Sequence, residues 1–166
     1  MPTKVRRNRP LRAGRALGIV LAAAGLNQAT LADGGPPRRH VAPLPSYQQE
    51  CAGCHLAYPP ALLPAESWRR LTSDLSRHFG TDASLDAATT QAISTWLSAN
   101  AGVTRRLREA PPQDRITTSA WFVHEHDEVQ TASWKHPAVK SAANCAACHS
   151  HADQGDFDEH DVRIPR

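Results

Sequence analysis

The amino-acid sequence predicts an all-α fold with few short helices joined by long loops. Apolar residues recur at intervals of three and four in several segments, which is the spacing of one face of a helix. No segment shows the alternation of apolar and polar residues that is typical of a half-buried strand. Thirteen prolines and nine glycines interrupt the chain, so the helices are expected to be short.

Residues 1–32 are predicted to be a secretory signal peptide. Six basic residues and no acidic one precede an apolar run of 11 residues, 16–26, which is too short to span a bilayer of about 30 Å. Small residues before Asp33 suit cleavage after Ala32. A twin-arginine signal at Arg6 and Arg7 is the alternative, but the following residues fit it poorly. We therefore expect a periplasmic mature protein without a membrane span.

Removal of the leader reverses the formal charge. The leader carries six of the 19 basic residues and none of the 16 acidic ones, so 13 basic residues remain against 16 acidic ones, a formal charge of −3. This balance argues against a nucleic-acid-binding function. It favours positively charged protein partners.

The mature chain is predicted to begin with a flexible lead-in and to continue as two lobes. Residues 33–46 are rich in Gly and Pro and contain no helix or strand pattern. We place the lobes at residues 47–110 and 111–166, because a charged and proline-broken connector precedes Pro112.

Four helices are expected. The first lies within residues 66–80, where Trp68, Leu71, Leu75 and His78 share one face and Gly80 ends the helix. The second covers residues 85–100 with Ser84 as its N-cap. The third covers residues 120–130, capped by Ser119 or Thr118, and a short fourth covers residues 141–151.

A motif of two cysteines and a histidine occurs twice and uses all four cysteines: residues 51–55 read CAGCH and residues 145–149 read CAACH. A zinc site usually joins cysteine pairs about 15 to 20 residues apart, whereas 91 positions separate Cys54 from Cys145. A thioredoxin-like site would need a βαβ pattern, and a disulfide framework has no use for a histidine placed identically twice.

Covalent haem attachment uses both cysteines and the histidine of each motif. The two thiols bond to vinyl groups of the porphyrin, and the following imidazole binds the iron. We therefore predict two haem c groups, with a zinc site or disulfides as the weaker alternatives. The predicted attachment residues are Cys51, Cys54, Cys145 and Cys148, and the predicted iron ligands are His55 and His149.

The composition limits the sixth ligand of each iron. Methionine and histidine are the usual choices, and the single methionine, Met1, leaves with the leader. Both sixth ligands are therefore histidines, or at least one iron has an open position. Seven histidines remain after His55 and His149 are assigned: His40, His78, His124, His126, His136, His151 and His160.

His78 and His126 are the preferred sixth ligands. An imidazole on the apolar face of the helix at residues 66–80 needs a polar or metal partner, which selects His78. Successive helical residues rotate by about 100°, so His126 points with Trp121 and Phe122, whereas His124 points nearly opposite. His136 is the reserve candidate.

The sequence resembles the bacterial dihaem cytochrome c family, often abbreviated DHC. The likeness lies in ECAGCHLAYPPALLPAESW, HFG, RITTSAWF, VKSAANCAACH and GDFDEHDVRIP, and covers about residues 47–166. It implies a small, mostly helical periplasmic protein with two bis-histidine haems that exchanges electrons with other redox proteins. In related systems these resemble a small oxygen-binding monohaem cytochrome and a membrane-bound cytochrome b. The resemblance also favours His78 and His126, without deciding which serves which haem.

The predicted function is electron transfer without catalysis. Two histidines on each iron are expected to give low potentials, because an axial methionine raises the potential. The alternatives are a peroxidase-like enzyme or a haem sensor, both of which need one labile sixth ligand.

Overall fold

The structure is a computed structural model that describes residues 41–165, all of which belong to one compact unit. The predicted signal peptide, His40 and most of the lead-in lie outside the described residues. The predicted division into two lobes stays a prediction. For reference, we call residues 41–110 the N-terminal half and residues 111–165 the C-terminal half.

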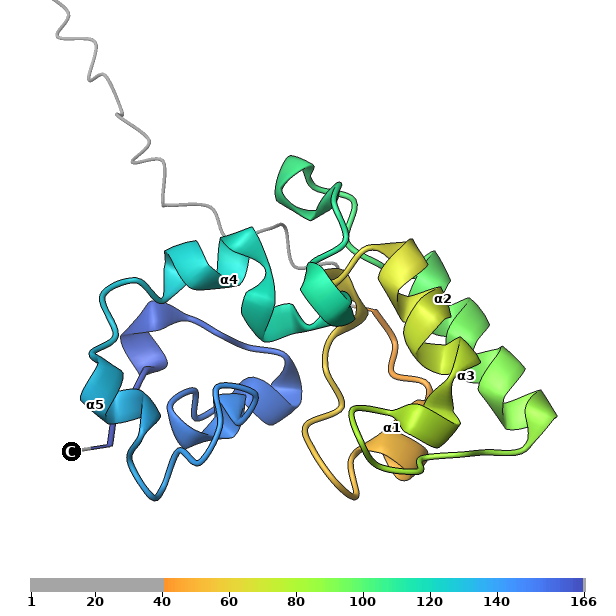
Figure 1. The fold of residues 1–166 in the computed structure, drawn as a ribbon, viewed down its shortest axis with the longest axis horizontal. Helices are drawn as coiled ribbons and strands as arrows, with labels where there is room; N and C mark the ends of the chain where they lie inside the picture. The colour runs from red at the N-terminus through yellow and green to blue at the C-terminus, as the bar shows by residue number, and fades with distance from the viewer. Residues whose placement is uncertain (1–40, 166) are drawn as a thin grey trace, which may run out of the picture. The chain divides into compact units, whose positions relative to one another are not determined.

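The all-α fold class is confirmed, since helices and loops account for the described residues and their only extended pairings are two isolated bridges, His78 with Thr81 and His149 with Val162. No helix among these residues is long and apolar enough to span a bilayer. The α-helices are α1 (Pro45–Cys51), α2 (Ala65–Ser73), α3 (Ala87–Ala99), α4 (Ala120–Glu125) and α5 (Thr131–Trp134) (Figure 1). The 3-10 turns are Pro60–Leu62, Leu75–Arg77, Arg105–Leu107, Pro112–Asp114, Ile116–Thr118, Cys145–Ala147, Ala152–Gln154 and Glu159–Asp161.

Helix α2 ends earlier than the sequence pattern predicts. Its last hydroxyl groups bond back to the helix, Thr72 Oγ1 to the carbonyl of Trp68 at 2.8 Å and Ser73 Oγ to that of Arg70 at 2.8 Å. Asp74 then leaves the helical conformation, with φ −137°. Ser, Thr and Asp compete for backbone groups in this way and weaken helices. His78 therefore follows a 3-10 turn in an extended conformation, and the prediction that it lies within the helix was wrong.

Helix α3 is capped by Asp86, not by Ser84 as predicted. The Asp86 carboxylate accepts hydrogen bonds from the backbone N–H groups of Ala88 and Thr89, both at 3.0 Å. Ser84 instead donates its backbone N–H to Asp82, within the preceding loop. An aspartate two residues further on caps the helix equally well, and the charge suits the helix dipole.

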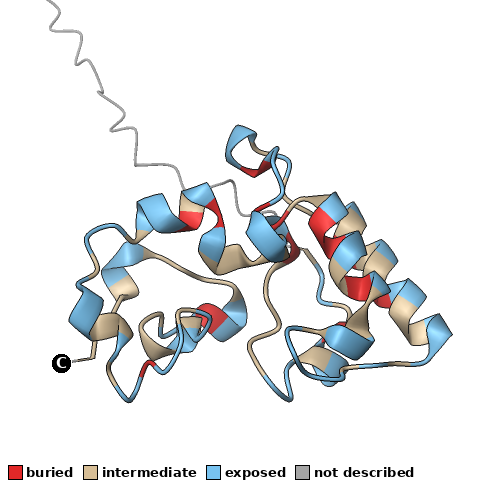
Figure 2. Cartoon of the chain, viewed as in Figure 1, coloured by how far each residue is buried: buried red, intermediate tan, exposed pale blue. Residues whose placement is uncertain are grey.

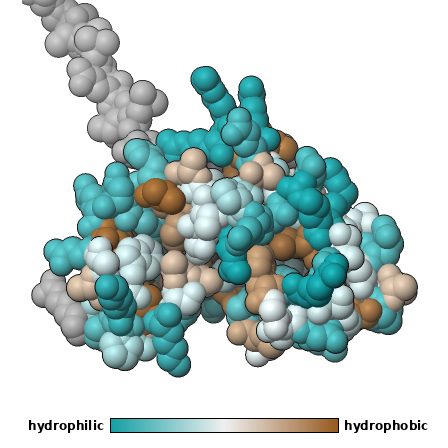
Figure 3. All heavy atoms as spheres, viewed as in Figure 1, coloured by the Kyte–Doolittle hydropathy of each residue, from teal (hydrophilic) through white to brown (hydrophobic). Residues whose placement is uncertain are grey.

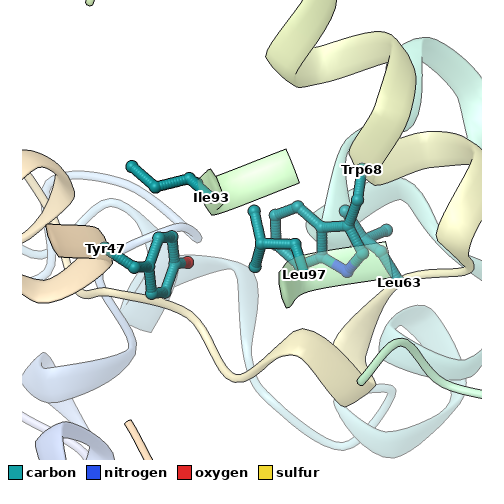
Figure 4. Close-up of a cluster of buried hydrophobic side chains, with 5 residues drawn as sticks. All are labelled: Tyr47, Leu63, Trp68, Ile93 and Leu97. Carbon is teal, nitrogen blue, oxygen red and sulfur yellow. The ribbon is translucent and has the colours of Figure 1, made fainter. Parts of the chain in front are cut away.

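Helices α2 and α3 pack side by side (Figure 1), and their contact forms the main hydrophobic core. The buried residues along these helices stand out in Figure 2. Figure 4 shows the core cluster, in which α1, the loop after the first motif and both helices each contribute side chains: Tyr47, Leu63, Trp68, Ile93 and Leu97. Hydrophilic residues are spread over the face seen in Figure 3, with near-neutral and hydrophobic residues between them.

Two hydrogen bonds attach the proline-rich loop after the first motif to this core. Trp68 Nε1 donates to the carbonyl of Pro60 at 2.7 Å, and Tyr47 Oη donates to that of Tyr58 at 2.9 Å. At the far end of α3, Gly102 donates its N–H to the carbonyl of Leu63, and any Cβ there would overlap Ala61 and Leu107. The core thus fixes the backbone on either side of the first motif.

The C-terminal half contains shorter helices than predicted. Ser119 caps α4 as expected, but the helix ends at Glu125 instead of near residue 130. His126 Nδ1 lies 2.8 Å from the carbonyl of Phe122, the group that a longer helix would use for its own hydrogen bond. The predicted helix at residues 141–151 is a 3-10 turn, because Ser141 and Asn144 form local side-chain bonds to the backbone.

Candidate metal centres

The first motif begins in α1 and continues into the turn that follows it. Cys51 is the last residue of α1, Cys54 lies in the turn, and both are free thiols. Burial, assisted by Glu50 and Cys54, raises the pKa of Cys51 to about 11. Redox-active cysteine pairs have lowered pKa values, so this environment does not suit thiol–disulfide exchange.

The second motif lies in the 3-10 turn Cys145–Ala147 and the residues after it. Burial raises the pKa of both Cys145 and Cys148 above the ordinary thiol value. The backbone N–H of Arg163 donates to the carbonyl of Cys148 at 2.7 Å, and Val162 pairs with His149. The end of the chain therefore holds the second motif in place.

The structure brings His55 and His78 together from segments that α2 separates. Their ring centres are 6.0 Å apart and their planes differ by 28°. With metal–imidazole bonds of about 2 Å, two imidazoles on opposite sides of one metal ion have ring centres about 6 Å apart. The separation therefore fits a shared metal ion.

His126 and His149 form a second pair with the same spacing. Their ring centres are 6.1 Å apart, and their planes differ by 75°. His126 comes from the end of α4, and its ring stacks on Phe122 at 4.1 Å. Each pair thus joins one motif histidine to one histidine outside the motifs.

One imidazole in each pair has its orientation fixed by a backbone carbonyl. His55 Nδ1 lies 2.6 Å from the carbonyl of Leu56, and His126 Nδ1 lies 2.8 Å from that of Phe122. A carbonyl oxygen only accepts hydrogen bonds, so each Nδ1 carries the hydrogen and each Nε2 is left free to bind a metal. This is the usual outer-shell arrangement of metal-bound histidines.

The other imidazole of each pair has a buried nitrogen without a protein partner. His78 Nδ1 and His149 Nδ1 make no hydrogen bond within the described residues. Burial lowers the pKa of His78, helped by His55 and Arg115, and burial also lowers the pKa of His149, helped by His126. Both histidines are therefore neutral near pH 7, which is the protonation state that binds metals. The donor set fits two haems.

Four aromatic residues near these pairs were not predicted as site residues. Tyr58 stacks on His55 at 4.9 Å, and its hydroxyl donates to the carbonyl of Ala143 at 2.7 Å, just before the second motif. Phe79 meets the edge of His78, Phe157 that of His149, and Trp134 approaches His126. Each of them lies within eight residues of the histidine that it contacts, but no periodic pattern in the sequence indicates them.

The remaining described histidines have polar partners or lie at the surface. His136 Nδ1, the reserve candidate, accepts the N–H of Ala138. His160 Nδ1 lies 2.8 Å from Asp158, and His151 Nδ1 lies 3.5 Å from Asp161. His124 is exposed. The structure brings none of these four into either pair of rings described above.

Comparison with known proteins shows one consistent relationship. The family model for dihaem cytochrome c matches residues 47–157. The X-ray structure of a diheme cytochrome type c from Shewanella baltica is 39% identical, with a TM-score of 0.65, over 73% of this chain and 92% of that chain. No curated protein shows detectable similarity to the chain.

Two structures of DHC from Rhodobacter sphaeroides give a similar result. One is 43% identical with a TM-score of 0.62, over 70% of this chain and 99% of that chain. The other is 44% identical with a TM-score of 0.63, over 70% of this chain and 98% of that chain. The similarity thus spans nearly the whole of each solved chain.

Proposed function

The chain belongs to the dihaem cytochrome c family, and on this premise we propose that it is a periplasmic electron carrier with two low-potential, bis-histidine haems. Its cofactors are two covalently bound haem c groups, and the family function is electron transfer. Bound haem supplies an iron that alternates between the ferric and ferrous states. The finer proposal concerns which residues hold each group.

The proposed N-terminal site consists of Cys51, Cys54, His55 and His78. The proposed C-terminal site consists of Cys145, Cys148, His149 and His126. The observation that carries this proposal is the pair of ring separations, 6.0 Å and 6.1 Å, each between a motif histidine and a histidine from another segment. Each iron would then have two histidine ligands from the chain, which would leave no position for a substrate or a gas.

The hydrogen bonds at Nδ1 support a low potential. A carbonyl that accepts the Nδ1 hydrogen makes an imidazole more basic and a stronger donor at Nε2. His55 and His126 have this bond, one in each site. Together with the absence of methionine after residue 1, it favours potentials below those of cytochromes with an axial methionine.

The proposed location follows from the N-terminal sequence pattern, and the proposed partners follow from the family resemblance and the formal charge. Haem c attachment takes place outside the cytoplasm, and residues 1–32 have the pattern of a secretory signal. The mature formal charge of −3 favours a positively charged docking surface on the partner. We propose a small monohaem cytochrome c and a membrane-bound cytochrome b as the partners.

The first test is the visible spectrum of the reduced holoprotein before and after addition of carbon monoxide. Two closed six-coordinate irons predict no change. His78→Ala and His126→Ala should each convert one haem to a form that binds carbon monoxide. His124→Ala, which changes an exposed neighbour in α4, is the matched control and should behave as the wild type.

Two results would contradict the proposal. If the wild-type protein binds carbon monoxide, one ligand is labile, and a haem sensor or a peroxidase-like enzyme becomes the better interpretation. If His78→Ala or His126→Ala leaves both haems low-spin and closed, that residue is not a ligand. A redox titration gives an independent check, because potentials in the range of cytochromes with an axial methionine would contradict the low-potential assignment.

A further inference from the structure

The two sites have matching aromatic neighbours. Phe79 meets the ring of His78 at 4.9 Å with the planes 62° apart, and Phe157 meets the ring of His149 at 5.3 Å with the planes 70° apart. Each phenylalanine thus contacts one axial histidine of its site edge to face. The two sites differ in the charged residues that lie near these phenylalanine–histidine contacts.

Arg115 brings a positive charge to the N-terminal site. Its guanidinium carbon lies 4.1 Å from the centre of the Phe79 ring, on the ring face. Its Nε donates to the side-chain amide oxygen of Gln113 at 3.1 Å, and no carboxylate of residues 41–165 forms an ion pair with it. An arginine keeps its charge at all ordinary pH values. The same charge helps to lower the pKa of His78.

The other arginines near His78 differ from Arg115 because carboxylates neutralise them. Arg70 donates from Nε and Nη2 to the two oxygens of Asp114, at 2.9 Å and 2.6 Å. Arg77 lies 2.9 Å from Asp74. Among Arg70, Arg77 and Arg115, only Arg115 therefore has no carboxylate partner within residues 41–165.

The C-terminal site lies beside an acidic segment. Residues 150–166 contain five carboxylates and two arginines. Asp156 and Asp161 gather around His151, two residues after His149, with ligand atoms of all three within 4.8 Å of one another. The Oγ of Ser150 donates to the carbonyl of Asp161 at 3.2 Å, which holds this segment close to the second motif.

We propose that Arg115 sets the order of reduction, so that the haem at the N-terminal site has the higher potential and the haem at the C-terminal site the lower. Reduction adds one electron, ferric to ferrous, without making or breaking a bond. A nearby positive charge favours that added negative charge, and nearby carboxylates oppose it. This inference rests on the proposed bis-histidine ligation of both sites.

The size of the effect follows from Coulomb's law. As a general estimate, a unit charge ~12 Å from a redox centre, at an effective dielectric constant near 20, changes the equilibrium constant for its reduction about tenfold. Arg115 acts through the electric field of its charge and does not bind the iron, so it affects only the reduction potential. Replacing Arg115 with a neutral side chain should lower the reduction potential of the N-terminal haem and leave that of the C-terminal haem unchanged.

The test is a redox titration of the holoprotein followed by electron paramagnetic resonance. The ferric signal of a haem with two imidazole ligands depends on the angle between the rings, which is 28° at the N-terminal site and 75° at the C-terminal site. The two haems can therefore be followed separately. The proteins to compare are the wild type, Arg115→Gln, Arg115→Lys and Asp161→Asn.

The signal from the N-terminal site should disappear first in the wild type. Arg115→Gln should make reduction of that haem about tenfold less favourable, Arg115→Lys should retain the wild-type order, and Asp161→Asn should make reduction of the other haem easier. The inference fails if the C-terminal haem is reduced first in the wild type. It also fails if Arg115→Lys lowers the potential of the N-terminal haem as much as Arg115→Gln does. If Arg115→Gln does not accumulate, an unchanged C-terminal potential in Asp161→Asn overturns it. A high-spin signal in the wild type would instead contradict the proposed ligation.

Discussion

The N-terminal and C-terminal halves bring two histidines together by different means. In the N-terminal half, α2 and α3 form a hydrophobic core that fixes the loop after the first motif through Trp68 and Tyr47. In the C-terminal half, the helices are four and six residues long and the second motif lies in a 3-10 turn. Its buried apolar side chains are few: Phe122, Val139 and Ala152.

From this difference we expect the two halves to depend on haem to different extents. Short helices without a shared core cannot offset the conformational entropy that ordering the chain costs. We therefore expect the C-terminal half to need the cofactor as its core, as small metal-binding domains need their metal. The N-terminal half already buries five large side chains without it.

Loss of haem attachment tests this comparison with the largest expected effect. Cys145→Ser combined with Cys148→Ser should remove the protection from hydrogen exchange of residues 120–165 while α2 and α3 stay protected. The matched control, Cys51→Ser with Cys54→Ser, should leave partial protection in α2 and α3, because the core there is formed by the protein. Retained protection in α4 of the first variant would contradict the comparison.

Truncation of a tryptophan in each half compares how much the two cores contribute to stability. Trp68→Ala should lower the free energy of unfolding by about 3 to 5 kcal/mol, since it empties the centre of the core. Trp134→Ala, the matched change at a half-buried position beside His126, should cost only about 1 to 2 kcal/mol. Urea unfolding of both holoproteins measures the difference. Equal losses would mean that the two halves share one core.

Removal of the α4 cap tests how much the helix that ends beside His126 depends on local hydrogen bonds. Ser119 Oγ accepts the N–H of Phe122 at 3.2 Å and donates to the carbonyl of Ile116 at 2.7 Å. Ser119→Ala should cost about 1 kcal/mol, because α4 is too short to be stable without its cap. Ser119→Thr keeps the hydroxyl and should stay close to the wild type in the same unfolding experiment. An equally large loss of stability in Ser119→Thr would mean that packing around Ser119, and not its hydroxyl group, is responsible.

The smallest effect on stability is expected from the hydrogen bond that joins the regions around the two motifs. Tyr58→Phe removes the hydrogen bond to the carbonyl of Ala143 and should cost about 0.5 kcal/mol. Burial raises the pKa of Tyr58 from 10.0 to about 12, so its contribution is complete below pH 10 and is lost as the pH rises toward 12. Stability curves from pH 9 to 12 should fall less steeply in Tyr58→Phe. Parallel curves would show that Tyr58 does not titrate with folding.

Local patterns were sufficient for part of the candidate sites. The two CxxCH motifs predicted two covalent haems, and the family relationship supports that prediction. Helix periodicity selected His78 and His126, although both helices end before those residues. The structure nevertheless places each of these two residues beside a motif histidine, and their role as iron ligands stays a prediction. The exact ends were missed, since side-chain bonds from Thr72, Ser73 and His126 stop the helices locally.

The sequence by itself determined the fold class, the two haem-attachment motifs and the absence of methionine after residue 1. These properties depend on residue types and short spacings, which are readable along the chain. Only the tertiary structure decided that His78 meets His55 and His126 meets His149, and that Arg115 lies over Phe79. Those contacts join segments between 20 and 40 residues apart, and packing of the whole chain, not local propensity, sets which distant residues meet.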